Sequence, residues 1–401
     1  MSVLSGKKVL LGITAGIAAY KTASLVRLFI KLGAEVQVIM TPASKDFITP
    51  LTLSTLSKNP VHSTFYDKEA ENELWNNHVD LGLWADIMVI APATANTLSK
   101  MTNGVCDNLL LATYLSSKCS VYFAPAMDLD MYIHPSTKNN LDKLQSFGNV
   151  MIPATSGELA SGLVGEGRMA EPEDIVSFIE KDLLDKLPLK GKKLLLTAGP
   201  TYEAIDPVRF IGNHSSGKMG FAIAKTAANL GAEVILIAGP SAQTIQHSFV
   251  KRIDVKSAEE MYTEAHKYFK EADIAILSAA VADYRPKNVA IQKIKKKDAS
   301  IEIVLEKTKD ILASLGEIKE HQLLVGFALE TNNEEENAIG KLKKKNLDLI
   351  VLNSLQDKGA GFATDTNKIT IIDKDLSMQT FGLKSKDAVA QDIMNAIVAK
   401  L

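Results

Sequence analysis

The residues best suited to chemistry lie between Gly199 and Gly220, and they include Asn213 and Lys218. An apolar strand pattern, Lys192 to Ala198, precedes this stretch, and an apolar helical pattern, Phe221 to Leu230, follows it. A polar turn between a strand and a helix directs backbone N–H groups and the helix N-terminus toward one point, which favours an anion. We therefore expect a phosphate or a carboxylate to bind there.

The segment from Gly212 to Lys218 has the glycine and lysine spacing of a phosphate-binding P-loop. The next residue is Met219, whereas a P-loop has Ser or Thr at that position to hold magnesium. The segment is therefore not a P-loop. From composition alone, a surface loop rich in Asn, Ser and Gly and without a ligand remains an alternative.

Length and composition limit the class of protein. A chain of 401 residues is long enough for two or three domains. The formal net charge of -2 does not indicate a nucleic-acid or anionic-membrane partner. The chain has only two cysteines, Cys106 and Cys119, and lacks an apolar run of about 18 residues. We therefore expect a soluble protein of the reducing cytoplasm.

Two parts of the chain open in the same way, at Lys7 to Tyr20 and at Lys192 to Gly199. Each continues through a helical pattern into Leu-Gly-Ala-Glu-Val, at Leu32 to Val36 and at Leu230 to Val234. A strand, a helix and a second parallel strand, joined by a tight glycine turn, account for both copies. This repetition predicts an α/β fold class with two doubly wound, Rossmann-like domains.

A short charged connector, Lys186 to Gly191, separates the halves, and we place the domains at residues 1–188 and 189–401. The segment Lys368 to Ile372 alternates as an edge strand would, and Lys384 to Leu401 has the pattern of an amphipathic helix. Five further apolar runs are typical of strands covered on both faces. They are Ile87 to Ala91, Val121 to Ala124, Ile274 to Ser278, Leu323 to Phe327 and Leu349 to Leu352.

In the first half, Gly12 and Gly16 lie at the first strand-to-helix turn without completing a Gly-x-Gly-x-x-Gly fingerprint. The end of the second strand, Val38 to Pro42, lacks the acidic residue that binds an adenosine ribose. A mononucleotide with a terminal phosphate therefore fits this half better than NAD.

Residues Lys8 to Ile175 resemble the flavin-containing cysteine decarboxylases in four motifs: Ala91 to Thr97, Asp107 to Leu110, Pro125 to Met131 and Ser161 to Met169. The resemblance implies a flavodoxin-like fold, an FMN cofactor and a flavin site between the subunits of a trimer. It places FMN against Gly12, Thr14, Gly16, Thr41, Ala91 and Thr94.

The resemblance also implies the chemistry of this half. The substrate is the cysteine adduct of phosphopantothenate, and FMN oxidises its thiol end to a thioaldehyde. Carbon dioxide then leaves because the thiocarbonyl can hold the developing charge. His78 matches the family's catalytic histidine and is expected to act as an acid or base. Without the resemblance, it would be interpreted as a solvated surface histidine.

Two further candidate catalytic residues depart from the family pattern. Asp128 stands where the family usually has Asn, and an ionised carboxylate would repel the substrate carboxylate unless it is protonated or faces elsewhere. Ser161 stands in a glycine-rich flap where many relatives carry a cysteine, and a hydroxyl is much less acidic than a thiol. Arg168, at the end of the flap, is either a ligand of the substrate phosphate or a plain surface arginine.

Residues Leu194 to about Ile372 resemble phosphopantothenate–cysteine ligase, so the whole chain resembles the bifunctional family that joins this ligase to the decarboxylase. The implied ligase reaction transfers the carboxylate of 4′-phosphopantothenate to CTP as an acyl cytidylate, which the amine of L-cysteine then attacks. Besides the Gly199 to Gly220 stretch, the matching motifs are Ala279 to Arg285, Lys293 to Lys297, Lys309 to Leu312, Gly326 to Asn332 and Lys341 to Asp348.

By the same motif matches, Lys293 is a catalytic residue that contacts the acyl cytidylate, and Asn213 binds and stabilises this intermediate, although an Asn that satisfies its own turn is the alternative. Magnesium is expected with the triphosphate, and no protein ligands are assigned to it. The implied CTP site comprises Ala279, Asp283, Lys293, Lys309, Asp310, Ile311, Leu312, Phe327, Lys341 and Lys345.

The resemblance implies a homo-oligomer, with a trimeric decarboxylase half and a dimeric ligase half that could combine into a dodecamer. Only small-molecule substrates are expected as further partners. Three other functions stay open: a ligase with an impaired decarboxylase half, an FMN-binding regulatory protein and a nicotinamide-dependent reductase. The absence of an acidic low-complexity tail disfavours the regulatory protein, and the missing ribose acid disfavours the reductase.

Overall fold

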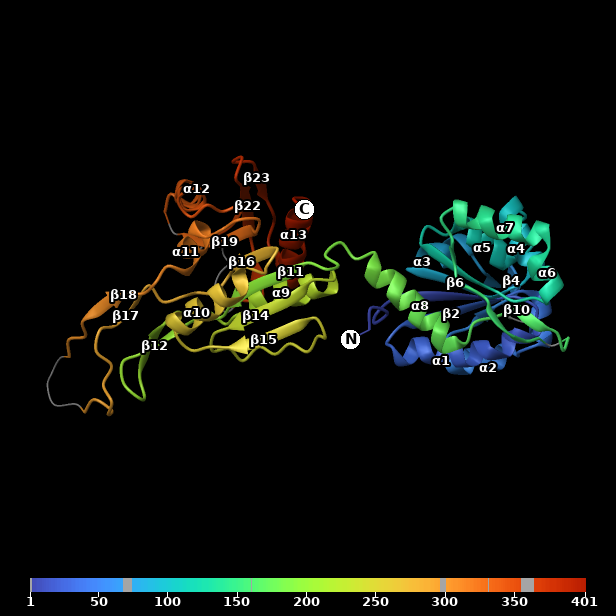
Figure 1. Ribbon diagram of the computed structural model, residues 1–401, viewed down its shortest axis with the longest axis horizontal. Coiled ribbons are helices and arrows are strands. Elements are labelled where there is room, and N and C mark those ends of the chain that lie inside the picture. The colour runs from blue at the N-terminus through green and yellow to red at the C-terminus, as the bar shows by residue number, and fades with distance from the viewer. Residues whose placement is uncertain (1, 68–73, 160, 296–300, 331, 355–363) are drawn as a thin grey trace. The chain divides into compact units, whose positions relative to one another are not determined.

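The chain forms two compact units, Met1–Asp185 and Lys186–Leu401, each with its own sheet and core (Figure 1). The computed structural model describes residues 2–67, 74–159, 161–295, 301–330, 332–354 and 364–401. In this part of the chain, none of the helices is both long and apolar enough to cross a membrane.

The first unit is built on a six-stranded parallel sheet with the order β3-β2-β1-β6-β7-β8. The pairing of β1 with β2 runs in register from Lys8 with Glu35 to Ile13 with Met40. The strands are β1 (Lys8–Ile13), β2 (Glu35–Met40), β3 (Val61–His62), β6 (Ile87–Ala93), β7 (Ser120–Pro125) and β8 (Val150–Met151).

Helices cover both faces of this sheet, because successive strand residues point to opposite sides and both sides are apolar. Val9 and Leu11 pack with α1, α2 and α8, whereas Leu10 packs on the other face with α3, α4, α5 and α7. The helices are α1 (Thr22–Lys31), α2 (Pro50–Ser57), α3 (His78–Trp84), α4 (Ala95–Asn103), α5 (Leu109–Ser116), α7 (Pro135–Ser146) and α8 (Pro172–Asp185).

Shorter elements connect these layers. The glycine-rich flap forms an antiparallel hairpin of β9 and β10. The bounds are η1 (Ile17–Lys21), η2 (Pro42–Asp46), β4 (Tyr66–Asp67), β5 (Leu74–Trp75), α6 (Leu129–Ile133), β9 (Thr155–Glu158) and β10 (Val164–Arg168).

The second unit contains an eight-stranded sheet with the order β15-β14-β11-β16-β19-β20-β22-β23. Its strands are parallel from β15 to β20, and β22 and β23 are antiparallel. The strands are β11 (Lys193–Ala198), β14 (Glu233–Ala238), β15 (Val250–Asp254), β16 (Ile274–Leu277), β19 (Leu323–Glu330), β20 (Leu349–Ser354), β22 (Ile369–Asp373) and β23 (Met378–Thr380).

Helices again cover both faces of the second sheet, with α9 and α13 on one face and α10, α11 and α12 on the other (Figure 1). The helices are α9 (Lys218–Asn229), α10 (Ala258–Phe269), α11 (Ile311–Glu317), α12 (Glu334–Lys344) and α13 (Lys386–Val398).

Two hairpins, β12–β13 and β17–β18, extend away from the second sheet, and β21 pairs with β24 beside it (Figure 1). The bounds are β12 (Tyr202–Ala204), β13 (Phe210–Gly212), β17 (Tyr284–Pro286), β18 (Leu305–Lys307), β21 (Thr366–Asn367) and β24 (Lys384–Ser385).

The predicted α/β class is confirmed, and all five apolar runs form sheet strands. The repeated Leu-Gly-Ala-Glu-Val segment makes the same helix-to-strand turn twice, with left-handed φ angles of 86° at Gly33 and 97° at Gly231. A Cβ at Gly231 would lie 2.9 Å from Leu187 Cβ, so the turn favours glycine for its space as well as its φ angle.

The prediction of an edge strand at Lys368 to Ile372 is wrong. β22 pairs with β20 on one side and β23 on the other, and β23 is the edge strand. The alternation arises because Ile369 and Ile371 enter the core beside α13, while Thr370 is only half-buried. Such a pattern reports how the two faces are covered and not whether the backbone is paired.

Candidate active sites

A cavity of about 960 Å³ opens where β1, β2, β6 and β7 end in the first unit. The loops that follow parallel strands meet at this edge of the sheet, which is the usual ligand position in doubly wound folds. The volume is large enough for a cofactor together with a substrate, since small-molecule sites span roughly 300–1,000 Å³.

Three of the six residues expected against FMN line this cavity: Gly16, Thr41 and Thr94. Thr14 lies behind the wall and positions Thr94, because the Thr94 N–H donates to Thr14 Oγ1 at 3.3 Å. Gly12 serves packing, since a Cβ there would lie 2.5 Å from Leu110 Cδ1. Ala91, the sixth, is fully buried within β6 and does not line the cavity.

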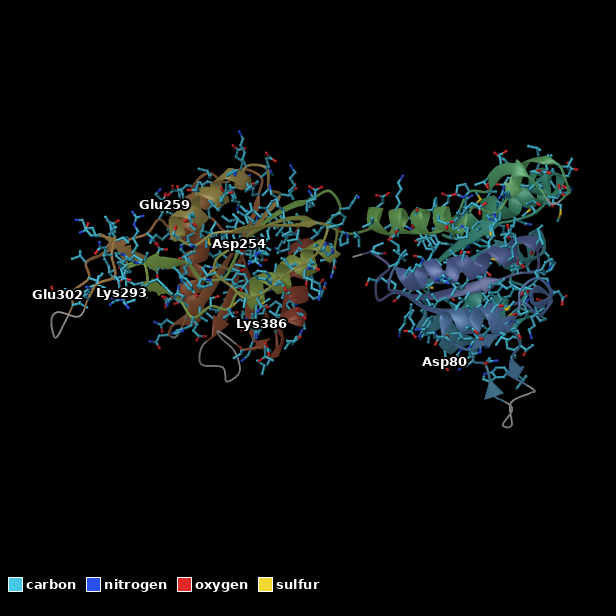
Figure 2. All side chains as sticks on the ribbon, turned by 90° about the horizontal axis from the view of Figure 1, so that it is seen from below. Asp80, Asp254, Glu259, Lys293, Glu302 and Lys386 are labelled. Atoms are coloured by element: carbon cyan, nitrogen blue, oxygen red, sulfur yellow. The ribbon has the colours of Figure 1, made fainter. Side chains whose placement is uncertain are left out.

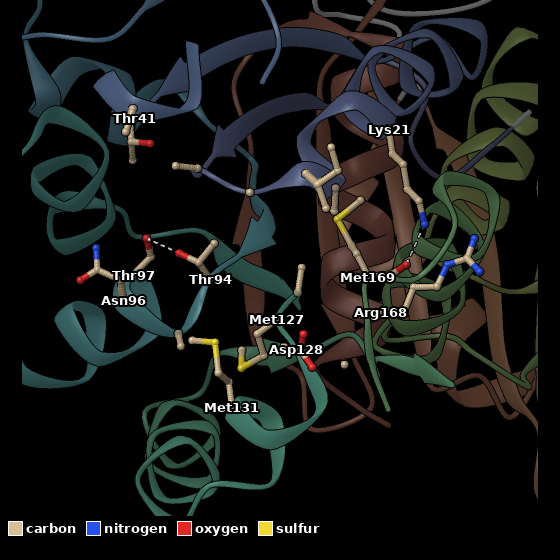
Figure 3. Close-up of a pocket in the computed structure, with 18 of the residues that line it drawn as sticks. Lys21, Thr41, Thr94, Asn96, Thr97, Met127, Asp128, Met131, Arg168 and Met169 are labelled. Carbon is tan, nitrogen blue, oxygen red and sulfur yellow. Dashed lines mark hydrogen bonds between the residues drawn. The ribbon is translucent and has the colours of Figure 1, made fainter. Parts of the chain in front are cut away.

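The Thr41 hydroxyl is the clearest sign that the cavity receives a polar ligand. Thr41 Oγ1 is shielded from solvent and has no hydrogen-bond partner among the described residues. A buried hydroxyl without a partner is costly, and because Thr41 lines the cavity, a turn of its side chain toward a ligand atom that bonds to it would remove that cost. Thr94 lines the same cavity, and its hydroxyl donates to Thr97 Oγ1 at 3.3 Å (Figure 3). These residues fit a flavin nucleotide, which offers many hydrogen-bonding groups.

Asp128 lines the cavity and caps the short helix α6. The Leu129 N–H donates to Asp128 Oδ1 at 2.6 Å. A capping oxygen can come from either Asn or Asp, so the departure from the family pattern preserves the loop geometry.

The sequence did not reveal a charged cluster at one end of the cavity. Lys21 is only 6% exposed, and its Nζ donates to Met169 O at 3.1 Å and to Glu171 Oε1 at 2.9 Å (Figure 3). Arg168 Nη2 lies 2.8 Å from the same Glu171 oxygen. The hydrogen bond from Lys21 lowers the pKa of the Glu171 carboxyl, and the charges of Lys21 and Arg168 lower it further. Glu171 therefore fastens the end of the flap to the first strand-to-helix turn.

His78 and Ser161 do not line the cavity of their own unit. His78 is the first residue of α3, and its Nδ1 is buried without a hydrogen-bond partner among the described residues. Its ring meets the Phe65 ring edge-on at 6.1 Å between centroids. Ser161 is exposed in the flap turn.

The second unit has a cavity of about 540 Å³ where β16 and β19 end. Eight of the ten residues expected to hold CTP line it, although they come from four separate segments of the chain. They are Ala279, Asp283, Lys309, Asp310, Ile311, Leu312, Phe327 and Lys345.

Lys309 and Lys345, which line this cavity, and Lys341, which lies near it, each have a carboxylate partner. Lys309 Nζ lies 2.6 Å from Glu259 Oε1 and 4.6 Å from the centre of the Tyr262 ring. Burial raises the pKa of the Asp310 carboxyl, but the Lys345 hydrogen bond and the Ala313 N–H outweigh this effect, so that pKa is lowered. The other pairs are Lys345 with Asp310 at 2.8 Å and Lys341 with Glu330 at 2.5 Å.

Lys293 and Lys341 do not line the cavity. Lys341 lies on α12, one turn before Lys345. Lys293 is exposed on the extension that carries β17 and β18, with Glu302, whereas Glu259 lies on the body of the unit (Figure 2). The structure therefore does not bring Lys293 to the other nucleotide-site residues.

Asn213 holds the backbone beside the cavity. Its Nδ2 donates to Ala280 O at 3.0 Å and to Val281 O at 3.1 Å, and both of these residues line the cavity. Asn213 therefore does not bond only within its own turn, which was the alternative, because its two partners lie 67 and 68 residues away in the sequence.

A smaller cavity of about 150 Å³ lies at the N-terminus of α9, where we expected an anion. Residues 215–220 line it, and Gly217, the N-cap residue before α9, has a φ of 79°. Ala279, Ala280 and Phe327 line both this cavity and the nucleotide cavity, so the two are adjacent. Within the described ranges there is no group of three His, Cys, Asp or Glu side chains that could hold a metal ion.

Comparison with protein families defines the class of protein. Residues 2–184 match the family described as Flavoprotein, and residues 189–401 match the DNA/pantothenate metabolism flavoprotein C-terminal domain. The protein is thus a flavoprotein with an attached pantothenate-metabolism domain, as the sequence predicted.

Curated relatives narrow this class. The chain is 43% identical to the coenzyme A biosynthesis bifunctional protein CoaBC of Bacillus subtilis over 399 residues, covering 99% of this chain and 98% of the relative. It is 41% identical to CoaBC of Escherichia coli over 401 residues, covering 99% and 98%. The chain belongs to the family of these bifunctional coenzyme A biosynthesis proteins. The family predicted from sequence is confirmed.

Other similar proteins cover parts of the chain. A cysteine/cysteine sulfinic acid decarboxylase of an unknown prokaryotic organism is 55% identical over 356 residues, covering 88% of this chain and 99% of the relative. Among solved structures, the C-terminal domain of a CoaBC protein is 44% identical, with a TM-score of 0.46 and coverage of 54% of this chain and 98% of that one.

Proposed function

We propose that the protein makes 4′-phosphopantetheine in two steps, by CTP-dependent coupling of 4′-phosphopantothenate to L-cysteine and FMN-dependent decarboxylation of the product. Family membership supports both halves. The observation that carries the ligase assignment is the convergence of eight predicted nucleotide-site residues, from Ala279 to Lys345, on one cavity. Chance grouping of residues from four segments would not produce this arrangement.

In the first unit, bound FMN would supply a two-electron acceptor for the thiol end of the substrate. The residues of the chain would bind the cofactor and the substrate and orient them. Thr41 Oγ1 and the Thr94 hydroxyl would hold the cofactor, and Asp128 shapes the loop at the cavity wall through its cap. Arg168, held by Glu171, offers a cation to the substrate phosphate at the cavity's edge.

In the second unit, the lysines would exchange their carboxylate partners for the triphosphate of CTP. Lys309 and Lys345 line the cavity and can neutralise phosphate charge as pyrophosphate leaves. Magnesium would enter with the triphosphate. The adjacent cavity at the N-terminus of α9 suits an anionic group of phosphopantothenate.

The proposed assembly has trimeric decarboxylase halves and dimeric ligase halves in a cytoplasmic homo-oligomer. A flavin site shared between subunits would explain why His78 lies outside the cavity of its own unit with a buried, unpartnered Nδ1. In such a site, His78 of a second copy would be the acid or base.

A second candidate is decarboxylation of free cysteine or cysteine sulfinic acid, because a relative of that name is 55% identical. Such an enzyme would need no nucleotide, and the cavity lined by the eight predicted CTP-site residues would have no use in its reaction. The substrate therefore decides between the two functions.

The test is to supply the purified protein with phosphopantothenate, cysteine, CTP and magnesium, and to identify the products by mass. The proposal predicts phosphopantothenoylcysteine and then phosphopantetheine, with neither product when CTP is omitted. A protein that releases carbon dioxide from cysteine alone, and does not consume CTP, would support the second candidate instead.

A further inference from the structure

Asp206 is a buried carboxylate for which the proposed mechanism has no use. It lies in the turn of the hairpin β12–β13, and its side chain is fully buried. Its Oδ1 accepts from the N–H groups of Val208 and Arg209, both at 2.8 Å. Burial raises the pKa of the carboxyl, but three backbone N–H donors and the Arg209 charge outweigh this effect, so the pKa lies below its ordinary value. The group is therefore an anion at neutral pH.

The third N–H donor comes from a distant part of the chain. Ile294, next to Lys293, donates its N–H to Asp206 Oδ2 at 3.1 Å. Arg209 binds Asp206 at 3.0 Å and donates from Nη2 to Ile294 O at 2.6 Å. Both backbone groups of Ile294 are thus held by one Asp–Arg pair. We call residues 287–295 the lysine strap.

The hairpin β12–β13 connects the Asp206–Arg209 pair to Asn213, the other candidate catalytic residue of the ligase. A further bond, from Ala290 N to Ile205 O at 3.0 Å, fixes the strap to the same turn. At the opposite end of the hairpin, Asn213 directly follows β13 and holds Ala280 and Val281 at the nucleotide cavity. The position of Lys293 relative to Asn213 is therefore set through β12–β13.

We propose that Asp206 is a positioning residue of the ligase reaction: it fastens the lysine strap to the hairpin β12–β13, and so fixes the point from which Lys293, which lies outside the nucleotide cavity of its own unit, reaches the acyl cytidylate. This role rests on the proposed function. An amide cannot replace the carboxylate, because both carboxylate oxygens accept N–H groups: Oδ1 from the turn and Oδ2 from the strap. The NH2 group of an Asn would face a donor at one of these two positions. Asp206→Asn therefore releases either the turn or the strap.

The test is a double-mutant cycle on the full-length protein, with CTP-dependent coupling and pyrophosphate release measured for Asp206→Asn, Lys293→Gln and the double variant. A displacement of about 1 Å at a reacting centre costs on the order of a hundredfold in rate. We expect a kcat loss of this order in Asp206→Asn, with the KM for phosphopantothenate nearly unchanged. The double variant should be no slower than Lys293→Gln alone, because a strap without its lysine has nothing to position.

Asp373→Asn is the matched control. Asp373 is also a buried aspartate that accepts two backbone N–H bonds, from Asp375 and Ser377, and pairs with Lys400 at 2.8 Å. It lies at the end of β22 and lines neither ligase cavity. Its variant should keep the wild-type kcat, and thermal unfolding should be measured for every variant.

Arg209→Gln is a second variant that tests the same role if Asp206→Asn does not fold. Its side chain is 44% exposed and bonds the strap directly, so its removal should leave the turn intact. It should show the same lack of additivity with Lys293→Gln. Losses that multiply in both double variants, or that equal the loss in Asp373→Asn, would overturn the role of Asp206. A wild-type protein without CTP-dependent coupling would overturn the proposed function and this role together.

Discussion

Replacing Thr41 by Val should stabilise the flavin-free protein and weaken flavin binding at the same time. Val has nearly the shape of Thr but no hydroxyl, so it removes the buried Oγ1 that has no partner in the described part of the first unit. An unsatisfied buried hydroxyl costs about 1–3 kcal/mol. For a unit of this size, that gain corresponds to an increase in Tm of about 2–10 °C in the flavin-free protein.

Thr41→Val should weaken FMN binding, because the complex with FMN loses the hydrogen bond that the Thr41 hydroxyl would make. One hydrogen bond to FMN is worth about 1 kcal/mol if its partner is neutral and about 1.5–3 kcal/mol if it is the phosphate. The Kd for FMN should therefore rise by about 5-fold to 150-fold. Quenching of FMN fluorescence measures the Kd, and differential scanning fluorimetry measures the Tm with and without FMN.

Thr113→Val is the control, because Thr113 is fully buried and its hydroxyl already donates to Leu109 O at 2.8 Å. This variant should gain no stability and keep the wild-type Kd, since Thr113 does not line the cavity. If flavin-free Thr41→Val unfolds at or below the wild-type Tm and binds FMN equally well, the hydroxyl is not a ligand of the cofactor.

Three further changes test the two sites. His78→Asn should keep the flavin absorbance but lose about 10²- to 10⁴-fold in carbon dioxide release, the usual range for a lost acid or base, and normal release would exclude this role. Lys345→Met should raise the KM for CTP about tenfold, since it removes a charged hydrogen bond, and an unchanged KM would place the triphosphate elsewhere. Glu171→Gln should destabilise the first unit at pH 7 by less than about 1 kcal/mol, because the carboxylate is 43% exposed. Because the pKa of Glu171 is lowered in the folded protein, the Lys21 pair stabilises fully above the ordinary Glu pKa of about 4.3, and this stabilisation is lost as the pH falls through the lower folded-state pKa. In urea titrations the gap between variant and wild type should therefore begin to shrink near pH 4.3 and close only at lower pH, and a constant gap would contradict this origin.

The sheets were predictable from sequence because their strands are short apolar runs between polar turns. Ile87 to Ala91 and Leu349 to Leu352 needed no tertiary information, since a strand buried on both faces is apolar throughout. β22 shows the limit of such patterns, because Ile369 and Ile371 indicate a covered face but not how many neighbours the backbone has.

Part of the proposed nucleotide site could be predicted, because Ala279 and Asp283 follow β16 and Phe327 lies in the neighbouring strand β19, and parallel strands end at one edge of a sheet. The counter-ions were not predictable. Lys309 pairs with Glu259, 50 residues earlier, and Lys21 pairs with Glu171, 150 residues later. No sequence spacing encodes such pairs, because they depend on how α10 and β10 pack.

One sequence signal marks the position of Asp206: it begins an Asp-Pro pair, which is typical of a turn. The turn itself could be inferred from this pair. The bond to Ile294 could not, since it spans 88 residues and depends on the course of the lysine strap.

The carboxylate partners of Lys309 and Lys345 would also affect how quickly the proposed nucleotide substrate binds. Because these two lysines are already neutralised, they project little potential into solvent, and an approaching anion gains little long-range attraction from them. Small ions such as inorganic phosphate would have to displace Glu259 or Asp310 one at a time, whereas a triphosphate can replace both at once. The ion pairs would therefore lower the rate at which a nucleotide associates with the pocket. In return, they would favour the binding of a triphosphate over that of simple anions.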